Sequence, residues 1–251
     1  MSGHSKWATI KHKKAQTDAR RGRAFTRVIK EITVAARSGG SDPDHNPRLR
    51  SAIAAAKAVS MPADNIKRAI QRGTGEIPGA VYEEVTLEGY GPGGVALIVE
   101  AATDNRNRTI SEIRHIFSRQ GGNLGEAGSV AWMFKKQGYI VVPKEKASED
   151  RLMGIALDAG ADDMRDDGSQ WEVFTPLEGF EAVLGALRAD NIETSLAEVS
   201  MIPQSYVKLE GKSAQQMVRL LEALEEHDDV QHLYSNFDAE ERELEAVTSG
   251  S

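Results

Sequence analysis

The sequence predicts an α+β protein of several domains, in which an N-terminal three-helix domain precedes two α/β domains, one inserted into the other. Apolar residues recur at helical spacing before the Pro78-Gly79 turn and in strand-like runs after it. Charge changes sign at nearly the same place. Residues 1–80 hold 16 Lys and Arg against 6 Asp and Glu, a net charge of +10, whereas residues 81–251 carry a net charge of −17. Such segregation indicates a polyanionic partner for the N-terminal end.

Three helices are expected in the basic segment, over residues 17–38, 47–59 and 62–72. The first has one apolar stripe at i, i+4, i+7 and i+11, formed by Phe25, Ile29, Ile32 and Ala36. Asn46 is the expected N-cap of the second helix, with Pro47 at its first position. Gly39-Gly40 should end the first helix and Gly73 the third. The segment therefore reads as a compact helical unit with a basic rim.

Beyond Pro78-Gly79 we expect strands over residues 81–88 and 95–101, joined by a glycine-rich loop at 89–94. Thr109-Ile110-Ser111-Glu112 has the form of a capping box that opens a helix ending at Gly121-Gly122. The end of the chain adds a strand at 204–209, a helix at 213–226 and a strand at 230–235. This β-α-β tail is too short for a domain of its own, so we expect it to complete the unit that starts at residue 81.

Residues 138–202 contain a separate β-α-β-β-α-β succession. Its expected elements are a strand at 139–142, a helix at 148–158, strands at 162–165 and 170–175, a helix at 177–189 and a strand at 193–200. This order matches a ferredoxin-like module, and we expect both α/β domains to be ferredoxin-like. The predicted domains are residues 1–80, residues 81–137 with 203–238, and the inserted residues 138–202, followed by an acidic tail at 239–251.

The residue types present argue against several kinds of chemistry. The absence of cysteine excludes disulfides, Cys-type zinc sites and thiol catalysis. The glycine-rich loop at 89–94 leads into a strand, whereas a phosphate-binding loop leads into a helix. His227 and His232 flank Asp228-Asp229, which would suit a metal, but a solvated helix end is the better interpretation. We therefore expect no enzyme activity, catalytic residue, metal, cofactor or small-molecule substrate.

The sequence also lacks a transmembrane run and an apolar signal region. We therefore expect a cytoplasmic protein with no membrane partner.

The first 30 residues hold nine Lys and Arg and a single acid, Asp18. A merely structural surface helix would carry compensating acids at i±4, so this pattern favours phosphate contacts whose affinity falls steeply with salt. Trp7 stands among the cations, where it would either stack on an exposed base or pin the arm to the helical unit. The predicted nucleic-acid-binding residues are His4, Lys6, Trp7, Lys11, His12, Lys13, Lys14, Arg20, Arg21, Arg23 and Arg27.

A second polar segment, residues 103–109, leads into a helix and contains Arg106 and Arg108. Helix capping is its plain role. The alternative is a secondary anion contact through the two arginines and the free backbone N–H groups of the helix start.

A series of short motifs runs from residue 2 to about residue 238 of the chain. Among them are Gly3-His4-Ser5-Lys6-Trp7, Lys11-His12-Lys13-Lys14, Met61-Pro62-x-Asp64-Asn65-Ile66, Arg72-Gly73-Thr74-Gly75-Glu76, Tyr90-Gly91-Pro92-Gly93-Gly94, Gly121-Gly122-Asn123-Leu124-Gly125 and Tyr234-Ser235-Asn236-Phe237. Together with the polar segment at 103–109, these motifs resemble the YebC/PmpR family, which includes the mitochondrial translational activator of cytochrome oxidase. The resemblance implies the same three-domain arrangement and neither enzyme activity nor a cofactor.

The resemblance implies one of two regulatory functions. Many family members are named transcriptional regulators, which implies a DNA-binding protein. Others resemble ribosome-associated translation factors that relieve stalling on proline-rich sequences, with the Gly-His-Ser-Lys-Trp arm reaching ribosomal RNA. The expected partner is therefore nucleic acid, either DNA or the RNA of the ribosome.

Overall fold

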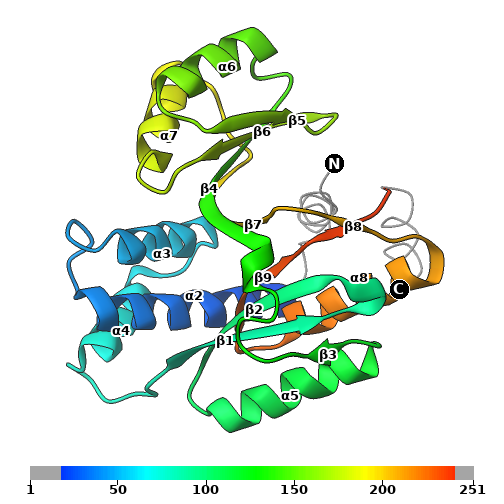
Figure 1. The fold of residues 1–251 in the computed structure, drawn as a ribbon. Helices are drawn as coiled ribbons and strands as arrows, with labels where there is room; N and C mark the ends of the chain where they lie inside the picture. Colours follow the sequence, from blue (N-terminus) through cyan, green and yellow to red (C-terminus); the bar gives the residue numbers. More distant parts are fainter. Residues whose placement is uncertain (1–17, 241–251) are drawn as a thin grey trace.

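The computed structural model describes residues 18–240, and side chains from residue 22 onward (Figure 1). Its N-terminal unit consists of the helices α2 (Asp18–Gly39), α3 (Pro47–Ala58) and α4 (Ala63–Thr74). The predicted cap of α3 is confirmed, because the Asn46 side chain accepts a hydrogen bond from the backbone N–H of Leu49 at 3.0 Å and Pro47 follows it. Small side chains of α3, among them Ala52 and Ala56, are buried against α2 and α4.

The third helix ends differently from the prediction. It continues through Gly73 to Thr74, and Gly75 provides the left-handed C-cap with φ 81°. Gly73 serves packing instead, since a Cβ atom there would lie 2.4 Å from the backbone oxygen of Thr33 in α2. The glycine therefore permits the close approach of α2 and α4.

The next unit is a four-stranded antiparallel sheet in the order β3-β1-β2-β9. Its strands are β1 (Glu83–Tyr90), β2 (Ala96–Thr103), β3 (Asn123–Leu124) and β9 (Val230–Ser235). The 3-10 turn η1 (Pro92–Gly94) joins the first two strands. The helices α5 (Arg106–Arg119) and α8 (Gly211–Glu226) cover one face of this sheet.

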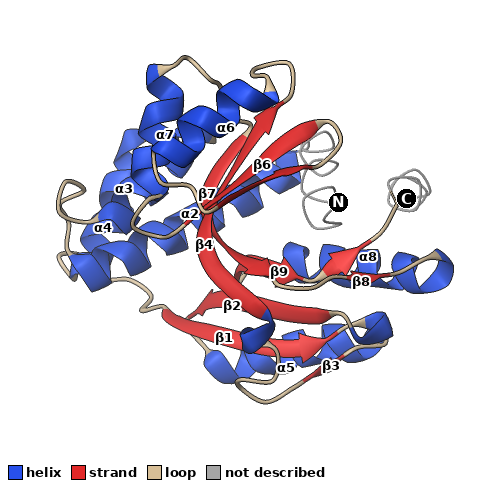
Figure 2. Ribbon diagram, turned by 45° about the horizontal axis from the view of Figure 1, so that its top comes forward, coloured by secondary structure: helices blue, strands red, loops and turns tan. Residues whose placement is uncertain are grey.

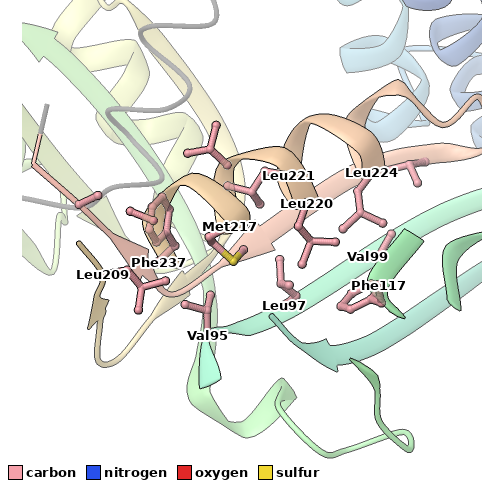
Figure 3. Close-up of a cluster of buried hydrophobic side chains, with 14 of the residues drawn as sticks. Val95, Leu97, Val99, Phe117, Leu209, Met217, Leu220, Leu221, Leu224 and Phe237 are labelled. Carbon is pink, nitrogen blue, oxygen red and sulfur yellow. The ribbon is translucent and has the colours of Figure 1, made fainter. Parts of the chain in front are cut away.

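The core of this unit lies between the sheet and its two helices (Figure 3). Leu97 and Val99 of β2 point toward Leu220 of α8 and Phe117 of α5, and all four side chains are fully buried. Burying apolar side chains of this size contributes roughly 1.5–3 kcal/mol each. This core therefore binds the C-terminal segment to strands that precede it by more than a hundred residues.

A second four-stranded antiparallel sheet has the order β5-β6-β4-β7. Its elements, in chain order, are β4 (Phe134–Pro143), α6 (Glu149–Asp158), β5 (Asp163–Asp166), β6 (Gln170–Thr175), α7 (Phe180–Ala189) and β7 (Leu196–Pro203). The predicted β-α-β-β-α-β succession is confirmed, and the strand order is that of a ferredoxin-like sheet. In the chain, these elements fall between β3 and β9 of the other sheet.

The long strand β4 takes part in both α/β units (Figure 2). Phe134 at its start packs on Ala96, Ile98 and Tyr234 of the first sheet, whereas Ile140 belongs to the core of the inserted unit. The predicted domain boundaries at residues 137/138 and 202/203 fall inside β4 and β7. The exact division into domains stays a prediction.

Two expected elements were wrong in detail. Helix α5 begins at Arg106 rather than at Thr109, because the Asn105 side chain caps it by accepting from the N–H of Arg108 at 3.1 Å. The strand expected at 204–209 shrinks to β8 (Val207–Lys208), which pairs in parallel with β10 (Phe237–Asp238) in a separate sheet. The pairing of β8 does not follow from local residue pattern, because β10 lies about 30 residues further along the chain.

Candidate nucleic-acid interface

The predicted arm lies outside the described residues. This applies to His4, Lys6, Trp7, Lys11, His12, Lys13 and Lys14. Arg20 and Arg21 lie in α2, but their side chains are also outside the described part. Their assignment to nucleic-acid binding stays a prediction.

The three helices of the N-terminal unit present further cations to solvent. Six side chains are exposed and form no salt bridge with any residue between 22 and 240: Arg37, Arg50, Lys57, Lys67, Arg68 and Arg72. We refer to them as the helical cations. They are divided among α2, α3 and α4, and they form the basic rim expected from the sequence. The sequence predicted these six side chains only through its overall count of charge in residues 1–80.

The cations of α2 that face the α/β unit have internal partners instead. The Arg27 guanidinium donates to the backbone oxygen of Glu225 in the last turn of α8, where carbonyl groups lack helical partners. Arg23 lies 3.6 Å from the Glu226 carboxylate. Burial lowers the pKa of Arg27, and the nearby Glu225 opposes this effect. A binding role for Arg23 and Arg27 stays a prediction, while the contacts give both side chains a role in joining two units.

Asp229 is the centre of the contacts that join α2 to the α/β unit, and we refer to these contacts as the junction. Its buried carboxylate accepts from the ammonium of Lys30 at 2.5 Å, from Arg108 at 3.0 Å and from the Thr109 hydroxyl at 2.6 Å. Burial alone would raise the pKa of Asp229, but these donors outweigh burial and hold that pKa well below its usual range. The junction therefore ties α2, α5 and the loop between α8 and β9 together.

The alternative roles of the polar segment at 103–109 can now be compared with its contacts. Asn105 caps α5, and Arg108 pairs with Asp104 at 2.9 Å as well as with Asp229. Arg106 is exposed. The capping role is confirmed by the Asn105 geometry, and a secondary anion contact through Arg106 and Arg108 stays a prediction.

Glu112, His227 and Asp229 bring ligand atoms within 4.8 Å of one another, a spacing that would suit a metal ion. The hydrogen bonds that these three side chains already form do not leave room for a metal ion. His227 Nδ1 accepts from the N–H of Asp229 at 3.1 Å, which leaves its Nε2–H to donate to Glu112 at 3.0 Å. Both Asp229 oxygens accept from the donors named above, two of which are cationic. A metal would have to displace these cations, so we interpret the group as a hydrogen-bonded junction.

Sequence reasoning missed the roles of Lys30 and Asp229. Charge counting groups Lys30 with the other N-terminal cations, but one residue further on, after Glu31, the uncharged run Ile32–Ala36 is entirely buried. A cation at the edge of a helix buried on several sides needs an acidic partner. That pattern could have indicated a buried pair, but no local feature identified Asp229 as the partner.

Between residues 18 and 240, the structure has no helix with the length and apolar character that crossing a membrane requires.

Comparison with known proteins covers nearly the whole chain. A family model described as "TACO1/YebC protein N-terminal domain" matches residues 5–76, and one described as "TACO1/YebC second and third domain" matches residues 82–237. A relative from Solibacter usitatus is 65% identical over 248 residues, which covers 99% of this chain and 100% of the relative. One from Acidobacterium capsulatum is 66% identical over 243 residues, covering 97% and 98%. Both are named "Probable transcriptional regulatory protein".

A solved structure is also similar. The crystal structure of a conserved hypothetical protein, Aq1575 from Aquifex aeolicus, superposes with a TM-score of 0.80 at 45% sequence identity. The match covers 90% of this chain and 93% of that one. The α+β fold, the matched domains and the full-length relatives lead to one assignment, which agrees with the motifs found in the sequence: the chain belongs to the TACO1/YebC family.

Proposed function

We propose that this chain is a non-enzymatic, cytoplasmic regulator of gene expression that binds DNA through its basic N-terminal segment. The observation that carries the proposal is the set of helical cations, which lie exposed and without acidic partners in the described chain. Exposed cations of this kind suit phosphate groups, and the sequence of the arm adds further cations to the same segment. The names of the relatives from Solibacter usitatus and Acidobacterium capsulatum support a role in transcription.

Three of the four buried carboxylates among the described residues support the absence of catalysis. Glu88 accepts from three backbone N–H groups, Glu172 accepts from the hydroxyl of Tyr139, and Asp229 accepts from two cations. A general acid or base needs a proton to exchange with a substrate, whereas these groups are occupied by structural contacts. They are therefore better explained as parts of the scaffold.

A second candidate function is binding to ribosomal RNA as a translation factor. The distribution of the helical cations favours it, because they are spread over three helices. A protein that reads DNA sequence usually places several base-reading side chains on one helix in the major groove. Cations spread over several elements suit a folded phosphate backbone, and they supply affinity without sequence selectivity.

The two candidates are separated by measuring duplex binding and ribosome association in parallel. Fluorescence anisotropy gives the affinity for specific and random DNA duplexes at about 150 mM salt, and sedimentation through sucrose gradients reports ribosome association. A DNA regulator should prefer its own site by about 10³-fold or more. Ribosome association that is lost in the Lys6→Ala/Trp7→Ala/Lys13→Ala variant, with only weak unselective duplex binding, would instead support the second candidate. Absence of both kinds of binding would reject the nucleic-acid proposal itself.

A further inference from the structure

Trp132 is the most exposed of the large apolar side chains in the described chain, with 68% of its surface accessible. It lies in the 3-10 turn η2 (Ala131–Met133), between β3 and β4. An exposed tryptophan gives up much of the stabilisation that burial would provide. Its surroundings indicate that the ring is presented on a fixed backbone rather than on a loose loop.

Glu88 of β1 fixes the chain that leads to this turn. Its buried carboxylate accepts hydrogen bonds from the N–H groups of Gly128 at 2.6 Å, Val130 at 2.7 Å and Ala131 at 2.8 Å. Burial by itself raises the pKa of Glu88, but the three N–H donors together lower it. The side chain therefore stays ionised and holds three successive parts of the loop.

Further hydrogen bonds hold the turn from its other side. The backbone oxygen of Ser129 accepts from the Tyr90 hydroxyl at 2.9 Å and from the Trp132 indole N–H at 3.1 Å. Gln204, beyond the end of β7, donates its backbone N–H to Met133 at 2.9 Å and its side-chain amide to Trp132 at 3.3 Å. Because the indole N–H is already bonded within the chain, a partner would contact the ring surface.

The charge around the turn differs from that of the rest of the α/β part. Residues 81–238 hold 28 Asp and Glu against 14 Lys and Arg, whereas the paired strands β4 and β7 contain Lys135, Lys136 and a single acid, Glu198. Lys135 has an acidic neighbour, since its ammonium lies 3.4 Å from Asp162. Lys136 is exposed and forms no salt bridge among the described residues, but its charge helps to lower the pKa of the nearby Glu84. A polyanion could therefore approach this part of an otherwise acidic surface.

We propose that Trp132 stacks on an unpaired base of a single-stranded nucleic acid. This contact would be made in addition to those of the basic N-terminal segment. The inference rests on the proposed function, which supplies the phosphate contacts. A flat ring on a fixed backbone loses little conformational freedom on binding, and base–aromatic stacking tolerates any sequence. The exposed Gln204, whose side-chain amide donates to the Trp132 backbone oxygen, presents its amide oxygen beside the turn for the same strand. The contact discriminates single strands from duplexes, whose bases are already stacked.

The test compares the full chain with Trp132→Ala, using labelled dT and U single strands of about 12 nucleotides and a dA·dT duplex of the same length. The alanine variant should lose about 5- to 100-fold in affinity for both single strands and less than about twofold for the duplex. Trp132→Phe should retain most of the affinity. Leu177→Ala is a matched control, because Leu177 is 48% exposed elsewhere on the α/β part, and it should change neither affinity.

Tryptophan fluorescence gives an independent measurement. In a Trp7→Phe chain, binding of a single strand should quench the fluorescence of Trp132. The buried Trp171 contributes a constant background. That background is measured by itself in the Trp7→Phe/Trp132→Phe variant. Unchanged single-strand affinity in Trp132→Ala, or equal losses for strand and duplex, would overturn the inference and leave the proposed function intact. A wild-type chain that binds duplex or ribosomes but no single strand would also overturn it. If the wild-type chain bound no nucleic acid at all, both this inference and the proposed function would be rejected.

Discussion

Asp229 joins parts of the chain that lie far apart in the sequence. Lys30 and Asp229 are both buried, with side-chain exposures of 8% and 6%, and Arg108 and Thr109 complete the contacts of the carboxylate. A buried ion pair of this kind adds little net stability over an apolar pair of similar volume. Removing one partner alone is costly, because the other charge stays buried without compensation. The junction therefore specifies how the helical unit docks.

Replacing Asp229 by Asn should lower the free energy of unfolding by about 3–5 kcal/mol, because Lys30 and Arg108 lose their common anion. Urea denaturation followed by circular dichroism measures the change. The matched control is Glu226→Gln, at an exposed pair with Arg23, which should change stability by less than about 1 kcal/mol. Lys30→Met combined with Asp229→Asn should be less destabilised than the two single losses added together. Strict additivity would show that the two side chains do not interact.

The same carboxylate predicts how stability depends on pH. The pKa of Asp229 is lower in the folded chain than the ordinary value of about 3.9 in the unfolded chain. Its stabilising contribution is therefore complete above about pH 5 and is lost as the pH falls below about 4 toward the folded pKa. The difference in unfolding free energy between wild type and Asp229→Asn should be constant from about pH 7 to 5 and shrink below about pH 4. A difference that grows with acid would contradict this linkage.

The Glu88 carboxylate should likewise stabilise the turn that carries Trp132. In Glu88→Gln one acceptor oxygen becomes an NH₂ group facing backbone N–H donors, so we expect a loss of about 1.5–3 kcal/mol. Hydrogen exchange at the amides of Gly128, Val130 and Ala131 should accelerate together, since all three lose a charged acceptor. Glu83→Gln, at an exposed position of the same strand, is the control and should alter neither measurement. Unchanged exchange in Glu88→Gln would show that the turn is held by its other contacts.

At the scale of elements, two helix glycines should respond in opposite directions to alanine. At Gly73 the new methyl group would meet the Thr33 backbone oxygen at 2.4 Å, so Gly73→Ala should destabilise the chain by about 1–3 kcal/mol. At Gly154 in α6 no atom lies within 4 Å of the added Cβ, so Gly154→Ala should stabilise it by about 0.5–1 kcal/mol. Thermal unfolding of both variants measures the pair. Equal shifts of the two melting temperatures would mean that α2 and α4 can separate slightly without cost.

Local patterns predicted most elements, since apolar spacing, Pro47 after Asn46 and the β-α-β-β-α-β order are all written in adjacent residues. The start of α5 was missed for a physical reason. Thr109 looks like an N-cap in sequence, but its hydroxyl donates to Asp229 across 120 residues, and Asn105 caps the helix instead. The two-residue strand β8 was overestimated because its only partner, β10, lies near the far end of the described chain.

At the scale of the whole molecule, charge patterning predicted a basic end and an acidic body, but not how the basic end divides. The structure separates its cations into those that dock α2 onto the α/β unit, such as Arg27 and Lys30, and the helical cations that remain exposed. Counting residues cannot make this distinction, because both sets have the same composition. It depends on where α8 ends and on which carbonyl and carboxylate groups lie there. The sequence therefore predicted which segment is basic, but it did not predict which of its cations are exposed on the surface.

This division predicts two classes of variants with opposite properties. Replacing Lys67, Arg68 and Arg72 of α4 by Ala should leave the melting temperature nearly unchanged, because none of the three forms a salt bridge among the described residues. It should flatten the dependence of log K on log salt for duplex binding by about 0.9 for each phosphate group that the variant no longer binds. Anisotropy titrations at several salt concentrations measure this slope.

Arg27→Met should behave in the reverse way. Its guanidinium is half-buried and donates to the end of α8, so the substitution should lower the melting temperature while leaving the salt dependence of the folded protein unchanged. Binding is measured well below the melting temperature, so that both variants are compared as folded chains. If Arg27→Met flattened the salt dependence as strongly as the α4 variant, the cations of α2 would have to leave α8 on binding. The junction would then separate when nucleic acid binds, and Asp229→Asn, by loosening the same contacts, should raise the affinity.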